Sequence, residues 1–169
     1  MKKLFLVLAF TLPLYLLSCQ AAKENNEGEE EGKEVLSSEK KKSEKATIQL
    51  TKEEFKQKVM DYENNDTWQF AGDKPCMIDF YADWCAPCRI TSPILEDLAK
   101  EYKGEIHIYK VDVDVEKELA SVFGIRGIPS FLYCPVDGKP QMASGIGQSK
   151  EDTKKMFINK IEQVLLKDD

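Results

Sequence analysis

The chain has 169 residues and a net charge of −6 at pH 7, with 24 Lys or Arg against 30 Asp or Glu. No basic stripe interleaves with aromatic residues, so we expect no nucleic-acid partner. His107 is the only histidine, which excludes a catalytic Cys–His pair that needs a second imidazole and leaves few possible metal sites.

The first 19 residues have the pattern of an export signal. A basic start is followed by an apolar run over 4–17, which is short for a membrane span. The run ends at Ser18-Cys19, which resembles the lipobox of bacterial lipoproteins, where the cysteine is lipidated and becomes the N-terminus. We predict lipidation of Cys19. An ordinary secretory signal with an incidental cysteine is the alternative.

Residues 20–46 alternate Glu and Lys with few apolar side chains, which is typical of a flexible tether. An export signal at 29–31 is the alternative to a plain solvated spacer. The folded domain is then expected over 47–169. Its first helix is predicted from a capping box formed by Thr51 and Glu54, and it should extend to about Glu63.

The remaining elements alternate between helix and strand. Predicted strands cover 76–81, 106–113, 130–134 and 141–144, and predicted helices cover 86–102, 115–123 and the segment after Ser149. Helices between strands favour parallel pairing, whereas Asp137-Gly138 favours a hairpin between the last two strands. We therefore predict an α/β fold, a mixed sheet with helices on both faces.

Cys85 and Cys88 form a C-x-x-C pair where a buried strand ends and a helix begins. A helix N-terminus lowers a thiol pKa, so Cys85 is expected to be the exposed attacking thiolate, and Cys88 the more buried resolving thiol. A zinc knuckle is the alternative, but zinc needs four ligands and no second pair is present. We expect no metal and no organic cofactor. Asp79, in an apolar strand, is a candidate proton carrier, or else an exposed strand carboxylate.

Four runs resemble thioredoxin across residues 50–166: 78–88, 93–95, 124–129 and Gly145. The resemblance implies the thioredoxin fold, with Asp79 beneath the cysteine pair, Lys110 near that carboxylate and Pro129 as a cis-proline facing the cysteines. A solvent-facing Lys110 and a trans Pro129 are the alternatives. The implied substrate-binding residues are Trp84, Gly127, Ile128, Pro129, Gly145 and Ile146. Ala86 departs from the usual glycine and Tyr81 from a frequent tryptophan.

Two further cysteines begin and end predicted strands. If those strands are antiparallel, Cys76 and Cys134 lie close together, as buried free thiols or as a second disulfide. His107 has no acidic or cysteine neighbour in sequence and is predicted to be structural.

These patterns predict a lipid-anchored thiol–disulfide oxidoreductase outside the bacterial cytoplasm, in the periplasm or facing outward. It would be a monomer that reduces protein disulfides and receives electrons from a membrane protein. One alternative is an enzyme that oxidises or isomerises disulfides. The other is a binding module that uses the fold only to hold partner proteins.

Overall fold

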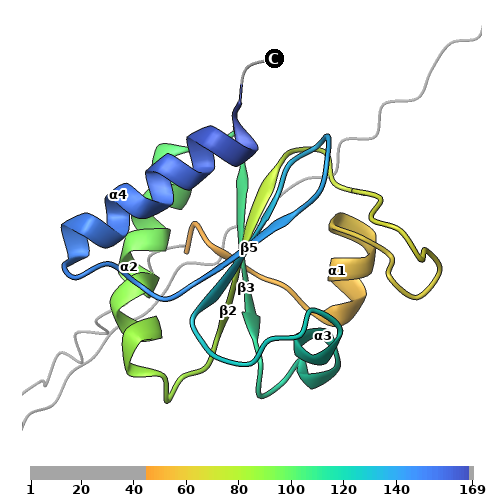
Figure 1. Ribbon diagram of the computed structural model, residues 1–169, viewed down its shortest axis with the longest axis horizontal. Coiled ribbons are helices and arrows are strands. Elements are labelled where there is room, and N and C mark those ends of the chain that lie inside the picture. The colour runs from red at the N-terminus through yellow and green to blue at the C-terminus, as the bar shows by residue number, and fades with distance from the viewer. Residues whose placement is uncertain (1–44, 168–169) are drawn as a thin grey trace, which may run out of the picture. The chain divides into compact units, whose positions relative to one another are not determined.

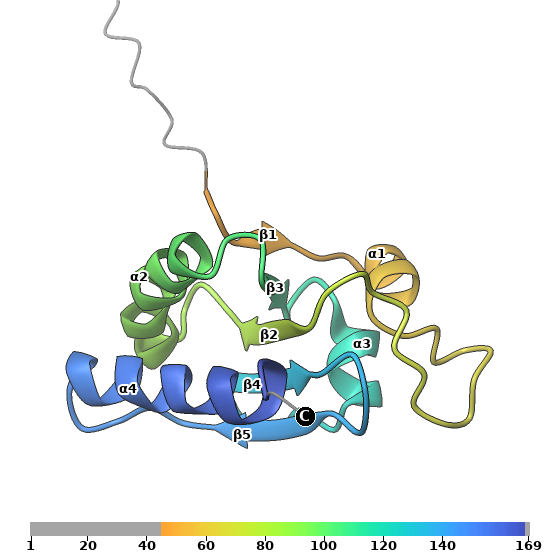
Figure 2. The ribbon, with the colours of Figure 1, turned by 90° about the horizontal axis from the view of Figure 1, so that it is seen from above.

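The computed structural model describes residues 45–167. The predicted signal segment, Cys19 and the tether up to residue 44 lie outside the described residues. Five strands form one sheet in the order β1-β3-β2-β4-β5. Helices α2 and α4 cover one face and α1 and α3 the other (Figure 1 and Figure 2). The predicted mixed α/β architecture is confirmed.

Most predicted elements are present, with small changes at their ends. The strands are β1 (Ile48–Gln49), β2 (Cys76–Tyr81), β3 (His107–Asp112), β4 (Ser130–Cys134) and β5 (Gln141–Ser144). The helices are α1 (Lys52–Lys58), α2 (Ala86–Glu101), α3 (Lys117–Val122), α4 (Lys150–Lys160) and the π-helix η1 (Ile161–Leu165). In residues 45–167, none of these helices has the length and hydropathy needed to cross a membrane.

Helix α1 begins as predicted but ends earlier. Thr51 and Glu54 form the expected capping box. The prediction that the helix reaches Glu63 is wrong, because the chain turns after Lys58. The turn buries consecutive side chains, Val59 and Met60, and leaves the Val59 carbonyl to accept a hydrogen bond of 2.9 Å from the Ala71 N–H. Continued helix would not offer that carbonyl to the returning loop.

Strand β1 was not predicted. Both of its residues are exposed and show no hydrophobic alternation, so the strand can be recognised only from its pairing with β3. The strand lies parallel to β3, with Ile48 opposite Tyr109. The Glu96 carboxylate on α2 accepts hydrogen bonds from the backbone N–H groups of Ala46 and Thr47 at the start of the described chain.

The core has one cluster on each face of the sheet. On the α1/α3 face, Phe55 and Phe80 are fully buried. On the α2/α4 face, Phe131 of β4 meets Phe157 of α4 edge-on, with ring centroids 4.8 Å apart. The cluster continues through Ile161, which keeps η1 against the sheet. Helix α4 is therefore attached to the sheet through this aromatic contact and the apolar residues that follow it, and it also packs against α2.

We predict that Phe157→Ala lowers the free energy of unfolding by about 3–5 kcal/mol, because it leaves a cavity beside Phe131. Urea unfolding followed by circular dichroism measures the change. Lys155→Ala, an exposed position on the same helix, is the matched control and should change stability little. Equal stabilities for the two variants would contradict the proposed attachment of α4.

Candidate active site

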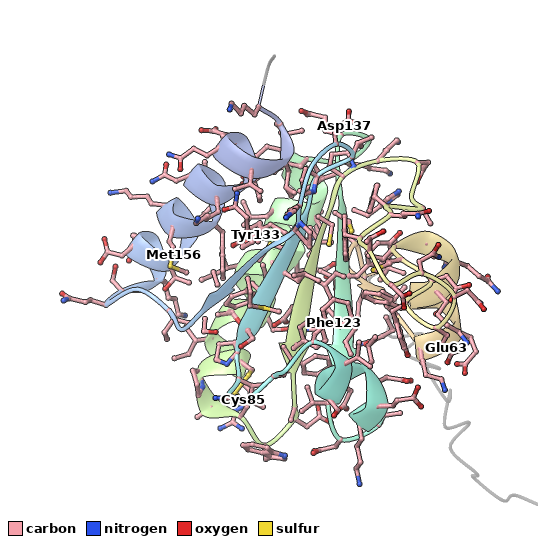
Figure 3. All side chains as sticks on the ribbon, turned by 45° about the vertical axis from the view of Figure 1, so that its right-hand side comes forward. Glu63, Cys85, Phe123, Tyr133, Asp137 and Met156 are labelled. Atoms are coloured by element: carbon pink, nitrogen blue, oxygen red, sulfur yellow. A yellow bond between two sulfur atoms is a disulfide. The ribbon has the colours of Figure 1, made fainter. Side chains whose placement is uncertain are left out.

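The cysteine pair lies at the junction of β2 and α2. Cys85 and Cys88 form a disulfide, and Pro87 stands in the first turn of α2. The Cys88 N–H donates to the Cys85 sulfur over 3.2 Å, so this sulfur takes the place of an N-cap side chain. Figure 3 shows Cys85 at one end of the sheet and Asp137 at the other. The helix N-terminus, with its partial positive charge, therefore faces the redox sulfur.

One sequence expectation about the pair is wrong. Cys85 is not exposed, because it and Cys88 each retain only 3% of their accessible surface. It is the N-cap residue, directly before the first helical residue, Ala86. The two cysteines and Ala82 form a small buried cluster against which Tyr81, Val113 and Ile128 pack. In the disulfide form, each sulfur is covered by its partner and by these side chains.

Asp79 lies in the middle of β2 and is completely buried. This excludes the alternative of an exposed strand carboxylate. Burial raises the pKa of Asp79, and the Lys110 ammonium opposes that rise through its charge and a hydrogen bond of 3.0 Å to Oδ2. The other oxygen, Oδ1, has no hydrogen-bond partner among the described residues. A carboxyl group with a raised pKa holds its proton more readily than an exposed one, which suits a proton carrier.

Lys110 is not a solvent-facing lysine, since it keeps 6% exposure. Its ammonium also donates to Ser92 Oγ at 3.1 Å and lies 4.2 Å from the centroid of the Tyr81 ring. The Tyr81 hydroxyl in turn accepts a hydrogen bond from Gln49. Groups from β1, β2 and α2 therefore hold one ammonium beside Asp79. Sequence reasoning missed Ser92, although it lies four residues after Cys88 and so on the same helix face.

The loop before β4 lies against the cysteine pair. The Ile128–Pro129 peptide bond is cis, as the resemblance implies, and the Ile128 side chain packs on the cysteine cluster. The Gly145 N–H donates to the Pro129 carbonyl at 3.2 Å and brings the end of β5 alongside. Gly127 and Gly145 are exposed and Ile146 is half-buried. The predicted rim on this side therefore comes from two neighbouring loops.

Trp84 is exposed next to Cys85 in the chain. Its side chain is 67% exposed, and its indole N–H donates to Asp114 Oδ2 at 2.8 Å. Asp114 follows β3, so a second loop orients the ring. A large exposed aromatic residue held in one orientation beside a disulfide can serve as a contact surface for another protein.

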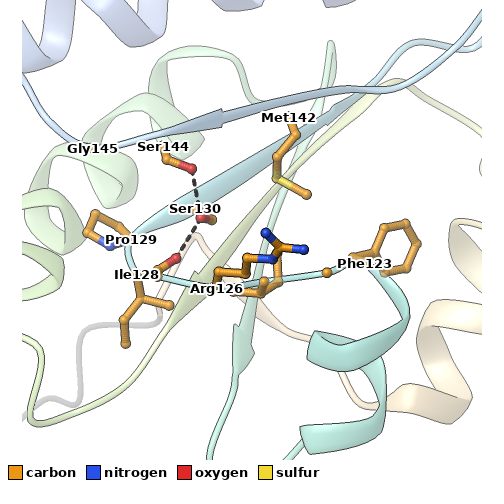
Figure 4. Close-up of a pocket in the computed structure, with 11 residues that line it drawn as sticks. Phe123, Arg126, Ile128, Pro129, Ser130, Met142, Ser144 and Gly145 are labelled. Atoms are coloured by element: carbon orange, nitrogen blue, oxygen red, sulfur yellow. Dashed lines mark hydrogen bonds between the residues drawn. The ribbon is translucent and has the colours of Figure 1, made fainter.

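A groove leads away from Ile128 and Pro129. It has a volume of about 480 Å³ and runs between the segment from Phe123 to Ser130 and the end of β5 (Figure 4). Four of its lining residues, Gly127, Ile128, Pro129 and Gly145, are among the predicted substrate-binding residues, but the sequence did not predict a groove. In residues 45–167, no group of three or more His, Cys, Asp or Glu side chains could hold a metal ion.

Comparison with known proteins agrees with this geometry. Residues 46–160, more than half of the chain, match the Thioredoxin family model. The chain belongs to the thioredoxin family. It is 50% identical over 101 residues to a thioredoxin of Borreliella burgdorferi, covering 60% of this chain and 86% of that protein. It is also 36% identical over 100 residues to thioredoxin 1 of a Nostoc strain, covering 59% and 84%. Membership identifies the chain as a thiol–disulfide oxidoreductase, and thioredoxins act on protein disulfides.

This thioredoxin carries two more cysteines at the other end of its sheet. Cys76 and Cys134 stand opposite each other in the antiparallel β2–β4 pair, and both are buried free thiols. Burial and the neighbouring Cys76 raise the pKa of Cys134 well above its usual value.

His107 has an acidic neighbour in space, since its Nε2 lies 3.1 Å from Asp73 Oδ1. His107 has no acidic neighbour in the sequence, and Asp73 comes beside it only in the folded chain.

We predict that Asp79→Asn changes how stability depends on pH. The free energy of unfolding of the variant, relative to that of wild type, should be higher at neutral pH than at acidic pH. Because the folded-state pKa of Asp79 is raised, the folded protein binds more protons than the unfolded chain between the unfolded value of about 3.9 and the raised value. Wild-type stability should therefore fall as the pH rises through that window, by about 1.4 kcal/mol for each pH unit that the window spans. Asp79→Asn removes the titrating group, so the stability of the variant should not show this fall.

Urea unfolding of both proteins across the acidic-to-neutral range measures the difference. Asp83→Asn, which changes an exposed carboxylate two residues before Cys85, is the matched control. Parallel stability–pH curves for wild type and Asp79→Asn would contradict the assignment. The same variant should slow disulfide exchange at neutral pH.

Proposed function

We propose that this thioredoxin reduces protein disulfides outside the cytoplasm, from a lipid anchor at Cys19. The observation that carries the reductase proposal is the disulfide between Cys85 and Cys88 at a helix start, with a buried carboxyl group in the preceding strand and Ile128 packed against the cysteines. This arrangement supplies a nucleophile, a resolving thiol, a proton carrier and a surface for a peptide.

In the proposed reaction, the reduced protein begins as a Cys85 thiolate. It attacks one sulfur of the substrate disulfide, so a Cys85–substrate bond forms and the other substrate sulfur leaves as a thiolate. Cys88 then loses its proton and attacks the Cys85 sulfur, which releases the second substrate thiol. Two electrons pass from the cysteine pair to the substrate, and the two released thiolates take up protons.

Asp79 is the proposed acceptor of the Cys88 proton. Its raised pKa and its unpartnered Oδ1 support this role, because both favour reversible protonation at this carboxyl. Lys110 supports the transfer by stabilising the carboxylate form. Ser92 and Tyr81 contact the Lys110 ammonium and hold it in place, so we assign them as positioning residues.

The proposed peptide contact is the backbone of Ile128. In the described residues, no group hydrogen-bonds to the Ile128 N–H or C=O, although the residue packs against the cysteine pair. An extended substrate segment can pair with this free backbone in the manner of an added strand. Trp84, on the other side, offers an exposed apolar face.

The proposed direction is reduction. Strongly oxidising pairs stabilise the thiolate of the reduced form, often through a polar or basic side chain between the cysteines. Here Ala86 and Pro87 provide no charge and no side-chain donor, and Asp83 adds a nearby negative charge that opposes thiolate formation. Electrons for a reductase outside the cytoplasm must cross the membrane, so we propose a membrane protein that transfers thiol electrons as the donor.

We predict that Cys88→Ser accumulates mixed disulfides while Cys85→Ser forms none, because only Cys85 attacks and only Cys88 releases. Incubation with oxidised insulin, followed by non-reducing electrophoresis and mass spectrometry, detects the adduct. Wild type should turn over without accumulation. Normal turnover by Cys88→Ser would overturn the assigned roles, and an inactive wild type would favour a binding module.

The redox potential should lie nearer the thioredoxin value of about −270 mV than the strong-oxidant value of about −120 mV. Equilibration with dithiothreitol and glutathione buffers, read by mass spectrometry after thiol alkylation, measures it. Ala86→His is the informative comparison, since an imidazole between the cysteines should raise the potential. A wild-type potential above about −180 mV would replace the reductase with an oxidase or isomerase.

Cys19→Ser should move the protein from the membrane fraction to the soluble fraction, because it removes the proposed lipidation site. Expression in a bacterial host, fractionation and mass spectrometry of the mature N-terminus provide the test. Cys134→Ser, at a buried cysteine in the folded domain, is the control and should stay with the membrane. A processed wild-type chain that remains soluble would show an ordinary secretory signal instead.

A further inference from the structure

One charged residue lines the groove beside Pro129. Eleven residues line it, and Arg126 is the only charged residue among them. Arg126 is exposed, and no carboxylate in residues 45–167 forms an ion pair with it. The guanidinium is therefore free to bind an incoming anionic group.

The other polar side chains of the groove are already occupied. Ser130 Oγ donates to the Gly127 carbonyl over 2.7 Å and lies 2.9 Å from Ser144 Oγ (Figure 4). These hydroxyls join the two walls to each other rather than facing a ligand. The guanidinium of Arg126 is consequently the charged donor that the groove offers to a bound segment.

The walls around Arg126 are apolar. Phe123 packs against Phe55 with ring centroids 5.0 Å apart, which makes this end of the groove part of the rigid core. Met142 on β5 forms the facing wall and is 42% exposed. Because Arg126 is itself exposed, water would leave its ion pair only when apolar residues of a bound segment pack on these walls, and that would strengthen the ion pair.

The opposite side of the cysteine pair carries the opposite charge. Asp83 and Asp114 are both exposed there, and Asp114 holds the Trp84 ring. Arg89 is also exposed and donates to the Asp83 carbonyl over 3.1 Å, so these three side chains together carry one net negative charge. A segment lying across Cys85 therefore meets negative charge at the Trp84 side and positive charge at the groove side. Such an asymmetry selects both the sequence and the direction of a bound segment.

We propose that Arg126 selects protein disulfides in which an acidic side chain lies a few residues to one side of the attacked cysteine, beside apolar residues. The acidic group would pair with the guanidinium while the backbone next to the cysteine pairs with Ile128. This inference rests on the proposed reductase function and adds the class of substrate to it.

The test uses homodisulfides of a short peptide with one cysteine, so that attack on either half gives the same products. Glu, Gln or Lys is placed two to five residues before or after the cysteine. Second-order rate constants with the reduced protein are divided by those with dithiothreitol, which removes intrinsic differences between the peptides. The Glu-to-Lys ratio is then compared within each protein variant, so a general loss of activity cancels.

For wild type, we expect the Glu peptides to react about two- to fivefold faster than the Lys peptides on one side of the cysteine only. Arg126→Ala should bring that ratio close to one, Arg126→Glu should invert it, and high salt should reduce it. Lys155→Ala, an equal charge change at an exposed α4 position, should keep the wild-type ratio.

A wild-type ratio near one at every position would overturn the role of Arg126 while leaving the reductase intact. The same ratio in Arg126→Ala and wild type would overturn it as well. Failure of wild type to reduce even the Gln peptides would instead overturn the proposed function itself, so the two failures are distinct.

Discussion

The buried contact between Asp79 and Lys110 constrains the alignment of the two central strands and links them to the helix that follows the disulfide. The two residues stand opposite each other in the parallel β2–β3 pair, and both are buried. A shift of that register by one residue would separate the charges and leave each one unpaired in the interior, which costs several kcal/mol. The pair therefore helps to specify how these strands align. Lys110 also donates to Ser92, four residues after Cys88 on α2, so the buried ion pair is linked to the helix that carries the second cysteine.

The burial of the cysteine pair in its disulfide form limits how a partner protein can approach it. Since Cys85 and Cys88 are almost fully covered, a partner must be recognised by the surfaces around them before exchange occurs. Those surfaces differ in character: Trp84 with its acidic neighbour lies on one side, and the groove with Arg126 lies on the other. The chemistry can thus be the same as in other thioredoxins while the choice of substrate depends on these surrounding side chains.

The two ends of β2 have different environments. At its carboxyl end the chain passes into the first turn of α2, where a partial positive charge faces the disulfide. At its amino end Cys76 is buried opposite Cys134, away from any helix start, and burial keeps the Cys134 thiol in its protonated form. Cysteine position relative to a helix N-terminus, rather than cysteine count, therefore separates the redox pair from the structural pair.

Features that depend on neighbouring residues could be predicted from the sequence alone. The capping box at Thr51, both ends of β4 and β5, and the cysteine pair between a strand and a helix all follow from local spacing, because capping, strand alternation and helix dipoles act over a few residues. Features that depend on distant segments required the folded chain. Strand β1 exists through its pairing with β3, Cys85 is covered by Ile128 from another loop, and Lys110 is held by Ser92 across the sheet face. These contacts join residues that no local pattern relates, so their energies appear only when the chain is folded.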